Sequence, residues 1–196
     1  MNTKTTEDKK PEAIVIGSSA GAVEALFSVL SGLPADYPIP IMVVVHLPPD
    51  KKSVISELLQ AKCSMDVHEA MDKEPIKAGT IYFAPPDYHI LVEPGKFLSL
   101  STEEPILFSR PAIDVLFETA ADVYGAYLLG IILSGASSDG ANGVKAIKNE
   151  GGRVIVQNPK DAYARPMPEA AIAACPDAEI MSLKQIALCI SNIGLS

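Results

Sequence analysis

The sequence has no tryptophan, and only 6% of its 196 residues are aromatic. Aliphatic side chains must therefore supply most of a hydrophobic core, and a hydrophobic content of 48% is enough for a substantial one. Basic residues are also few, because 16 Lys and Arg stand against 24 Asp and Glu and leave a net charge of −8. Binding to nucleic acid or to an anionic membrane requires a basic surface, so this balance argues against both.

Cysteines and long apolar segments are scarce as well. The three cysteines, Cys63, Cys175 and Cys189, are odd in number and form no Cys-x-x-Cys pair, which favours buried thiols in a reducing compartment. The first twelve residues are polar and lack the apolar core of a signal peptide. No apolar run approaches the roughly 20 residues of a membrane span. We therefore expect a cytoplasmic protein that does not insert into a membrane.

Short apolar runs alternate with segments of helical periodicity. The runs predict buried strands at residues 13–16, 39–45, 127–133 and 153–157. Later helices are predicted at residues 112–123, 139–149, 168–175 and 183–190. This alternation indicates an α/β fold with a doubly wound, mostly parallel sheet in a Rossmann-like three-layer arrangement. Residues 90–100 are expected to add an inserted antiparallel hairpin.

Three further expectations concern the domain limits and the first half of the chain. We expect residues 1–11 to form a disordered tail and residues 12–196 to form a single domain. Apolar spacing assigns the inner faces of the first two helices to Val23, Leu26, Phe27 and Leu30 and to Val54, Ile55, Leu58 and Leu59. The cluster of Cys63, Asp66, His68 and Glu69 lacks the spacing of metal ligands, so we expect it in an exposed loop.

Reactive side chains follow the predicted strands at the points where they end. They are Ser18 and Ser19 after the first strand, His46 after the second, Ser134, Ser137, Ser138 and Asp139 after the third, and Gln157, Asn158 and Asp161 after the last. Because the carboxyl ends of parallel strands meet at one edge of a sheet, we expect these side chains to lie near one another. Together, serine, histidine and aspartate can act as a nucleophile, its base and the group that orients the base. Taken singly, a serine or aspartate before a helix is an ordinary N-cap.

The turn Gly17-Ser18-Ser19-Ala20-Gly21 would suit either a nucleophilic serine or a bound phosphate. Its Gly-x-Ser-x-Gly spacing matches the nucleophile elbow of α/β-hydrolases, but in that fold the acid precedes the histidine in the sequence. The turn has neither the Lys-Ser/Thr of a P-loop nor the glycine spacing of a dinucleotide site, which makes phosphate binding the weaker alternative. The residues alone leave open which serine would react.

Several segments together carry a family resemblance. They are IGSSAG (16–21), VHLPP (45–49), YFAPPDYH (82–89), SRPAIDVLF (109–117), LSGASSDGA (133–141), QN (157–158) and MPEAA (167–171). In this order, across residues 12–192, they resemble the chemotaxis protein-glutamate methylesterase family (CheB-type). Any one of them alone would be unspecific, but the set is not.

The resemblance implies a serine esterase built on a parallel α/β sheet. It implies hydrolysis of glutamate methyl esters on the cytoplasmic helices of chemoreceptors, with release of methanol, and deamidation of receptor glutamines by some members. It selects Ser19 as the nucleophile, His46 as the base and Asp139 as the orienting acid, and it places the backbone N–H of Ala136 at the oxyanion. It implies no metal and no cofactor.

The chain departs from the family pattern in two segments and leaves other functions open. Ala20-Gly21-Ala22 stands where the family often has Thr-Gly-Gly or Ala-Gly-Gly. Ala136 and Ser137 stand where the family often has Met and Gly, which should alter the wall of the pocket and leave the triad in place. Residues 1–11 could not form the receiver domain that often precedes this one, so phosphorylation control would either be missing or come from another chain, such as a separate receiver or methyltransferase protein. Arg110 and Arg165 are candidate substrate contacts. The alternatives are a non-catalytic binding module of the same fold and a serine esterase with another substrate.

Overall fold

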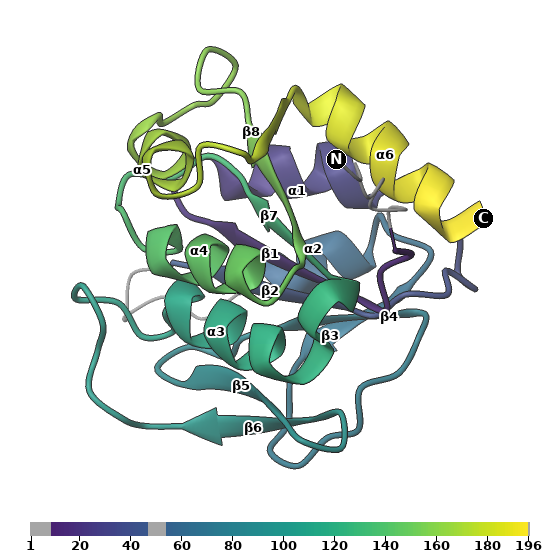
Figure 1. Cartoon of the computed structure of the whole chain (residues 1–196). Helices are drawn as coiled ribbons and strands as arrows, with labels where there is room; N and C mark the ends of the chain where they lie inside the picture. Colours follow the sequence, from purple (N-terminus) through teal and green to yellow (C-terminus); the bar gives the residue numbers. More distant parts are fainter. Residues whose placement is uncertain (1–8, 47–53, 196) are drawn as a thin grey trace, which may run out of the picture.

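The computed structural model describes residues 9–46 and 54–195, and within them seven strands form one sheet in the order β3-β4-β2-β1-β7-β8-β9 (Figure 1). The strands are β1 (Ala13–Ser18), β2 (Ile41–Val45), β3 (Asp66–Glu69), β4 (Thr80–Phe83), β7 (Leu128–Ile132), β8 (Arg153–Gln157) and β9 (Glu179–Met181). Every pairing between neighbouring strands of this sheet is parallel. The doubly wound, parallel α/β fold expected from the sequence is thus confirmed. The expected tail lies mostly outside the described residues.

The three central strands, β1, β2 and β7, are buried along their whole length. Their sequences are nearly continuous apolar runs because helices cover both faces of the sheet at this point. The register pairs Gly17 of β1 with Val44 on one side and with Ile132 on the other. The three strands therefore end level with one another, and the segments that follow them start at the same edge.

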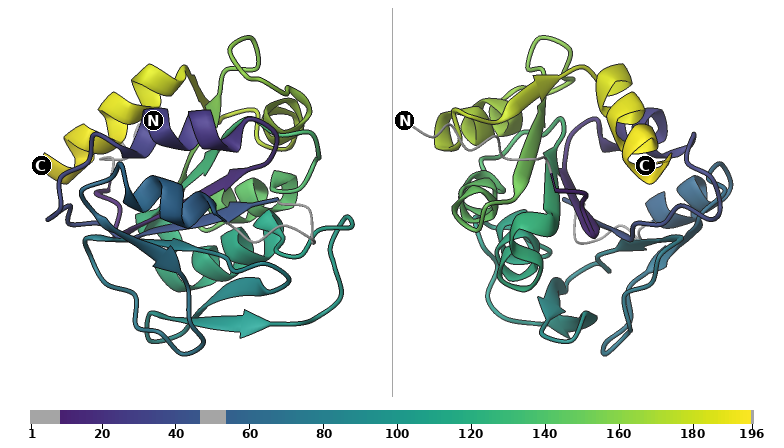
Figure 2. Two further views of the ribbon diagram at one scale, coloured as in Figure 1. Left: turned by 180° about the vertical axis from the view of Figure 1, so that it is seen from behind. Right: turned by 45° about the vertical axis from the view of Figure 1, so that its right-hand side comes forward.

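Helices form a layer on each face of the sheet (Figure 2). Among the described residues, one layer consists of α1 (Ala22–Leu30), α2 (Ile55–Gln60) and α6 (Leu183–Leu195). The other consists of α3 (Ile113–Tyr124), α4 (Ala141–Asn149) and α5 (Pro166–Ala174), and the short 3-10 helix Gly125–Tyr127 leads from α3 into β7. The sheet separates two apolar cores, one containing Leu26, Leu59 and Ile186 and the other Phe117, Val144 and Ala171.

An antiparallel hairpin packs beside α3 on the same face of the main sheet. It consists of β5 (His89–Glu93) and β6 (Phe97–Ser101), which pair with each other to form a separate two-stranded sheet within the described chain. Its inward side chains Ile90, Val92 and Leu98 share a core with Leu116 and Phe117 of α3. The hairpin predicted between residues 90 and 100 is confirmed, and it lies against α3 (Figure 1).

The inner faces predicted for the first two helices were partly wrong. In α1, Val23 is 41% exposed and Phe27 only partly buried, whereas Ala22 and Ala25 face the core. These alanines allow α1 to lie close to the sheet, but they contribute little to a hydrophobic pattern. In the second helix the buried positions are Ile55, Ser56 and Leu59, while Val54 and Leu58 are half-exposed. This helix has only the sheet edge beneath it, which one narrow apolar stripe can cover.

The segment expected as an exposed loop at Cys63–Glu69 is also different. Cys63 is buried, and Asp66–Glu69 is the edge strand β3, which pairs with β4. Only Val67 in this strand is buried. The sequence of the strand therefore lacks the alternation of apolar and polar residues that predicts a strand. The opposite edge strand, β9, is three residues long, has no buried residue and was missed for the same reason.

Candidate active site

The candidate site lies where the strand order reverses, at the carboxyl ends of β1 and β7. Such a switch point is the usual ligand site of open α/β sheets, because the neighbouring connections leave in opposite directions. Backbone hydrogen bonds hold the strand ends together: the N–H of Ser19 donates to the carbonyl of Ser134 at 2.9 Å, and the N–H of His46 donates to the carbonyl of Ser18 at 3.2 Å. The turns after β1, β2 and β7 therefore meet at one place, as the sequence predicted.

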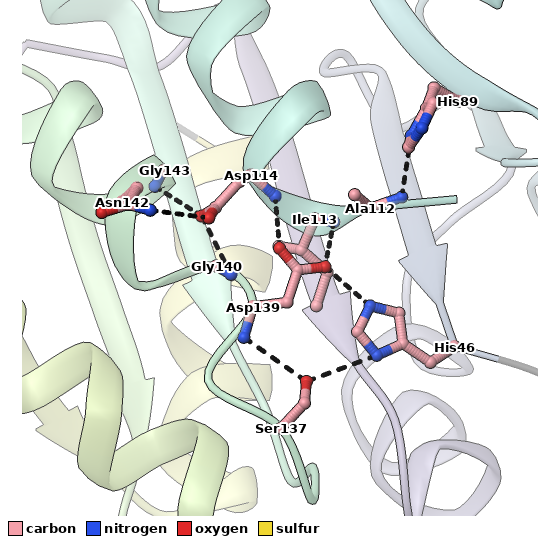
Figure 3. A network of polar contacts seen from close by, with 10 residues as sticks. All are labelled: His46, His89, Ala112, Ile113, Asp114, Ser137, Asp139, Gly140, Asn142 and Gly143. Carbon is pink, nitrogen blue, oxygen red and sulfur yellow. Dashed lines mark hydrogen bonds and ion pairs between the residues drawn. The ribbon is translucent and has the colours of Figure 1, made fainter. Parts of the chain in front are cut away.

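His46 and Asp139 are in direct contact at this point (Figure 3). The distance from Nε2 of His46 to Oδ2 of Asp139 is 2.7 Å, and the Asp139 side chain is fully buried. The same carboxylate accepts the N–H groups of Ile113 at 2.6 Å and Asp114 at 2.9 Å, at the N-terminus of α3. These bonds and the dipole of α3 fix the carboxylate. Because a carboxylate only accepts hydrogen bonds, Nε2 of His46 is the protonated nitrogen in this contact, which leaves Nδ1 as the acceptor nitrogen of the ring.

Asp114 is a second buried carboxylate beside this pair, and sequence reasoning gave it no role. It accepts the N–H groups of Gly140 at 2.9 Å and Gly143 at 2.7 Å and the side-chain amide of Asn142 at 3.1 Å. Burial raises the pKa of Asp114, the negative charge of Asp139 adds to this rise, and the bonds from Gly143, Asn142 and Gly140 oppose it. Its position in the first turn of a helix was a signal for capping. However, its partners lie 26 to 29 residues away.

The serines near His46 differ in what their hydroxyls do. Ser18 is fully buried and its hydroxyl donates to the carbonyl of Ser134 at 2.8 Å, so it is not available for reaction. The hydroxyl of Ser137 lies 3.4 Å from Nδ1 of His46 and also accepts the N–H of Asp139 at 3.4 Å (Figure 3). Ser19 is partly exposed at the start of the turn into α1. Within the described residues, its hydroxyl makes no hydrogen bond with His46.

Ser134 ties the surrounding turns together. Its hydroxyl donates to the carbonyl of Ala20 at 2.7 Å and accepts the N–H of Ala164 at 2.8 Å, while its own N–H donates to the side-chain oxygen of Gln157 at 2.8 Å. Ser134 and Gln157 are each 1% exposed. The sequence placed both at this edge of the sheet. The structure shows that they join the turns after β1, β7 and β8.

Backbone N–H groups near these serines are free to bind an anion. Among the residues that the structure describes, none accepts a hydrogen bond from the N–H of Ala20, Gly21 or Ala136. Ala20 and Gly21 immediately precede α1, where the helix dipole favours negative charge. Ala136, the predicted oxyanion residue, is exposed in the turn between β7 and α4. These donors are of the kind that stabilises an oxyanion during acyl transfer.

His46 and Ser19 border different hollows. His46 lines a cavity of about 170 Å³ together with Phe108, Ser109 and Arg110 from the segment between β6 and α3. Ser19 lines a hollow of about 310 Å³ with Val45 and Tyr163. Val45, the residue before His46, lines the Ser19 hollow, so the two spaces lie on neighbouring residues of the chain.

The two arginines predicted as substrate contacts have different surroundings. Arg110 donates from Nε and Nη2 to Asp87 Oδ1 at 3.0 and 2.7 Å, and from Nη1 to the carbonyls of Thr102 at 2.8 Å and Glu103 at 3.0 Å. Its guanidinium therefore braces the segment beside the His46 cavity. Arg165 is exposed just before α5, and its side chain makes no ion pair with another described residue. The Arg165 side chain is therefore available to a ligand, whereas the Arg110 guanidinium is already hydrogen-bonded to residues of its own chain.

The described residues contain neither a metal site nor a membrane-spanning helix. No group of three or more His, Cys, Asp or Glu side chains in this part of the chain could hold a metal ion. None of the described helices is long and apolar enough to cross a membrane.

A histidine–aspartate pair beside a serine in a strand–turn–helix is an arrangement typical of serine hydrolases. A family model described as CheB methylesterase matches residues 14–190, and the chain therefore belongs to the CheB methylesterase family.

Relatives and a solved structure agree with this assignment. A Leptospira interrogans protein, provisionally named protein-glutamate methylesterase/protein-glutamine glutaminase, is 47% identical over 176 residues, which are 90% of this chain and 91% of the relative. A protein-glutamate methylesterase/protein-glutamine glutaminase from Trichodesmium erythraeum is 37% identical over 91% of this chain, which spans only 51% of that relative. The crystal structure of the Thermotoga maritima CheB methylesterase catalytic domain is similar with a TM-score of 0.89 and 31% identity, covering 96% of this chain and all of the other.

Proposed function

We propose that this chain hydrolyses glutamate methyl esters on the cytoplasmic helices of chemoreceptors, with Ser19 as nucleophile, His46 as base and Asp139 as orienting acid. The observation that carries the proposal is the 2.7 Å contact between His46 and the buried Asp139 beside the Ser19 turn, in a chain of the CheB methylesterase family. The names of the relatives support both methyl-ester hydrolysis and glutamine deamidation. Receptor helices of this kind would place the reaction in the cytoplasm.

The first step forms a glutamyl-enzyme ester. Because Nε2–H of His46 is held by Asp139, Nδ1 is the nitrogen that takes the proton of the Ser19 hydroxyl. The serine oxygen then bonds to the ester carbonyl carbon, and the carbonyl oxygen becomes an oxyanion near the free N–H groups of Ala20, Gly21 and Ala136. As the bond to methoxide breaks, the imidazolium returns its proton and methanol leaves.

The second step restores the enzyme. Water gives one proton to Nδ1 of His46 and attacks the same carbonyl carbon, and His46 passes that proton to the Ser19 oxygen as the bond to it breaks. The glutamic acid product loses the second water proton to solvent and leaves as its carboxylate. With a glutamine substrate the same steps release ammonia in place of methanol. Asp139 keeps the ring in one orientation throughout and stabilises the imidazolium.

In the productive complex the Ser19 hydroxyl takes the place of the Ser137 hydroxyl at Nδ1. Without substrate, Nδ1 has the Ser137 oxygen at 3.4 Å, a long and weak contact that a better partner can replace. Catalytic hydrogen bonds often become short only when substrate is bound, so the separation of Ser19 from His46 is compatible with this mechanism.

The test is methanol release from a receptor cytoplasmic fragment that carries glutamate methyl esters. Ser19→Ala should reduce release to the background rate, whereas Ser138→Ala, at an exposed position of the turn after β7, should leave it unchanged. Release by Ser19→Ala combined with loss in Ser137→Ala would make Ser137 the nucleophile and overturn the assignment. No release by the wild-type chain, with retained binding of the fragment, would favour a binding module. Hydrolysis of small esters alone would favour an esterase with another substrate.

Control by a separate receiver or methyltransferase protein is a further part of this proposal. It rests on the family resemblance. Co-purification of such a protein with the chain, and a change in its rate of methanol release, would test it.

A further inference from the structure

The segment between β6 and α3 protrudes from the molecule (Figure 1). In its middle, residues 106–109 form a small apolar hairpin. Ile106 and Ser109 form an antiparallel bridge, in which each N–H donates to the other residue's carbonyl, at 3.0 and 2.8 Å. The turn between them consists of Leu107 and Phe108, with φ angles of 48° and 64°. Two positive φ angles in a two-residue turn are typical of type I′, which strongly favours Asn-Gly.

Leu107 and Phe108 are therefore energetically unfavourable in the type I′ turn that they form. Bulky side chains rarely adopt a positive φ, and here they gain little burial in return. Ile106 is 38% exposed, Leu107 51% and Phe108 102%. These three residues are called the apolar tip below. Exposed apolar side chains on strained backbone lower both stability and solubility, and such a combination occurs where a surface contacts a partner.

The apolar tip adjoins the candidate active site. Phe108 lines the same cavity as His46, and Arg110 holds the base of the segment through Asp87 and the carbonyls of Thr102 and Glu103. The cavity of about 170 Å³ is smaller than the roughly 300–1,000 Å³ of small-molecule pockets, so it has room for one side chain of a protein substrate. The remainder of that substrate must lie outside, and the apolar tip is the wall that it meets.

We propose that the apolar tip is a docking element for the substrate helix. An apolar side chain of that helix packs on Phe108 and Leu107 while the esterified glutamyl side chain enters the cavity at His46. The inference rests on the proposed function, because the occupant is the protein that carries the ester. Exposed carboxylates on the same segment, Glu103 and Glu104, disfavour an anionic lipid surface as the occupant.

The test replaces the apolar tip by the residues that its turn prefers. The double variant Leu107→Asn and Phe108→Gly keeps the type I′ turn and removes both side chains. We expect its thermal midpoint to stay the same or rise. We expect kcat/KM for the methylated receptor fragment to fall by about tenfold or more, mainly through KM, as for loss of an aromatic anchor at an interface. The fall should exceed any change with p-nitrophenyl acetate, a small ester that needs no docking.

Two further variants make the result decisive. Leu188→Asn, at an exposed apolar position on α6, is the matched control and should leave both activities unchanged. Phe108→Asn alone should show a smaller loss of the same kind and serves if the double variant folds poorly. Equal changes with the fragment and the small ester would overturn the docking role and leave the proposed function intact. No methanol release by the wild-type chain would overturn both. A dimer that only the wild-type chain forms would assign the tip to self-association and overturn the proposal.

Discussion

The Asp139 carboxylate caps the N-terminus of α3, and the Asp114 carboxylate caps the N-terminus of α4. Asp139 precedes α4 and accepts the first N–H groups of α3, whereas Asp114 belongs to α3 and accepts N–H groups at the start of α4. The N-cap residues of these helices, Ala112 and Gly140, make no side-chain cap of their own. Since Asp139 also holds His46, the contact between α3 and α4 and the orientation of the ring depend on the same two side chains.

Removal of one of the two caps should therefore affect both stability and activity. Asp114→Ala leaves buried N–H groups of Gly140 and Gly143 without an acceptor, which should lower the free energy of unfolding by about 2–3 kcal/mol. Methanol release should also slow, because the turn that carries Asp139 is no longer held. Urea denaturation and the release assay measure the two effects. Asp122→Ala, at an exposed position of the same helix, is the control, and an equal loss in both variants would contradict the capping role.

The raised pKa of Asp114 predicts a specific pH dependence of stability. Burial is its main cause, so the native state holds this proton at a pH where the unfolded chain, with a pKa of about 3.9, has released it. The contribution of Asp114 is therefore fully present below that unfolded value and is lost as pH rises toward the raised native pKa. Asp114→Asn removes this titration. The unfolding free energy of the wild type minus that of Asp114→Asn should decrease as pH rises from about 4. An increase of this quantity with pH would refute the assignment.

Ser137 should act as a competitor of Ser19 at the base. Its hydroxyl lies on Nδ1 of His46, the nitrogen that must accept the Ser19 proton. A typical hydrogen bond contributes about 0.5–1.5 kcal/mol and this long one no more than that, so Ser137→Gly should speed acylation of Ser19 by at most about two- to tenfold. The burst of methanol in the first turnover measures this rate. Ser138→Gly adds the same backbone freedom one residue later and should not change it. Slower acylation in Ser137→Gly would show that the hydroxyl assists the reaction.

Gly21 should tolerate no side chain. Its φ is +83°, and an added Cβ would lie 2.7 Å from Cβ of Tyr163 and 3.1 Å from the Ser134 hydroxyl. Gly21→Ala should lower the free energy of unfolding by about 1–2 kcal/mol from the backbone alone and displace the turn that carries Ser19. Gly32→Ala is the matched control, because nothing lies within 4 Å of the added atom and its φ is not positive. Thermal unfolding of the two variants provides the comparison, and equal midpoints would disprove the constraint.

The fold was predictable where strands are buried on both faces. The runs at the centres of β1, β2, β7 and β8 are almost continuous in apolar residues, and they are buried there. The inner face of α1 was not predictable, because Ala22 and Ala25 face the sheet and add little to a hydrophobic pattern. The edge strand β3 has one buried residue in four, so its sequence shows no alternation of apolar and polar residues.

The sequence predicted those site residues that directly follow the strands of the sheet. The positions of His46 and Asp139 followed from parallel strands that end at one edge, and their contact fulfils that expectation. The role of Asp114 depends on N–H groups of another helix, and no local pattern indicates such a distant partner. The place of Ser137 at Nδ1 depends on the course of a turn, which its residue types do not specify. The catalytic roles of Ser19, His46 and Asp139 stay predictions.

The two short edge strands limit how the sheet can grow. β3 and β9 have four and three residues, so each offers few backbone groups to a strand from another molecule. In β3, His68 is held by Glu74 at 2.8 Å and Asp66 at 3.3 Å, and its ring packs against Tyr82 of β4. A sheet with a strongly apolar centre therefore offers only short stretches of backbone for strand addition at its two margins.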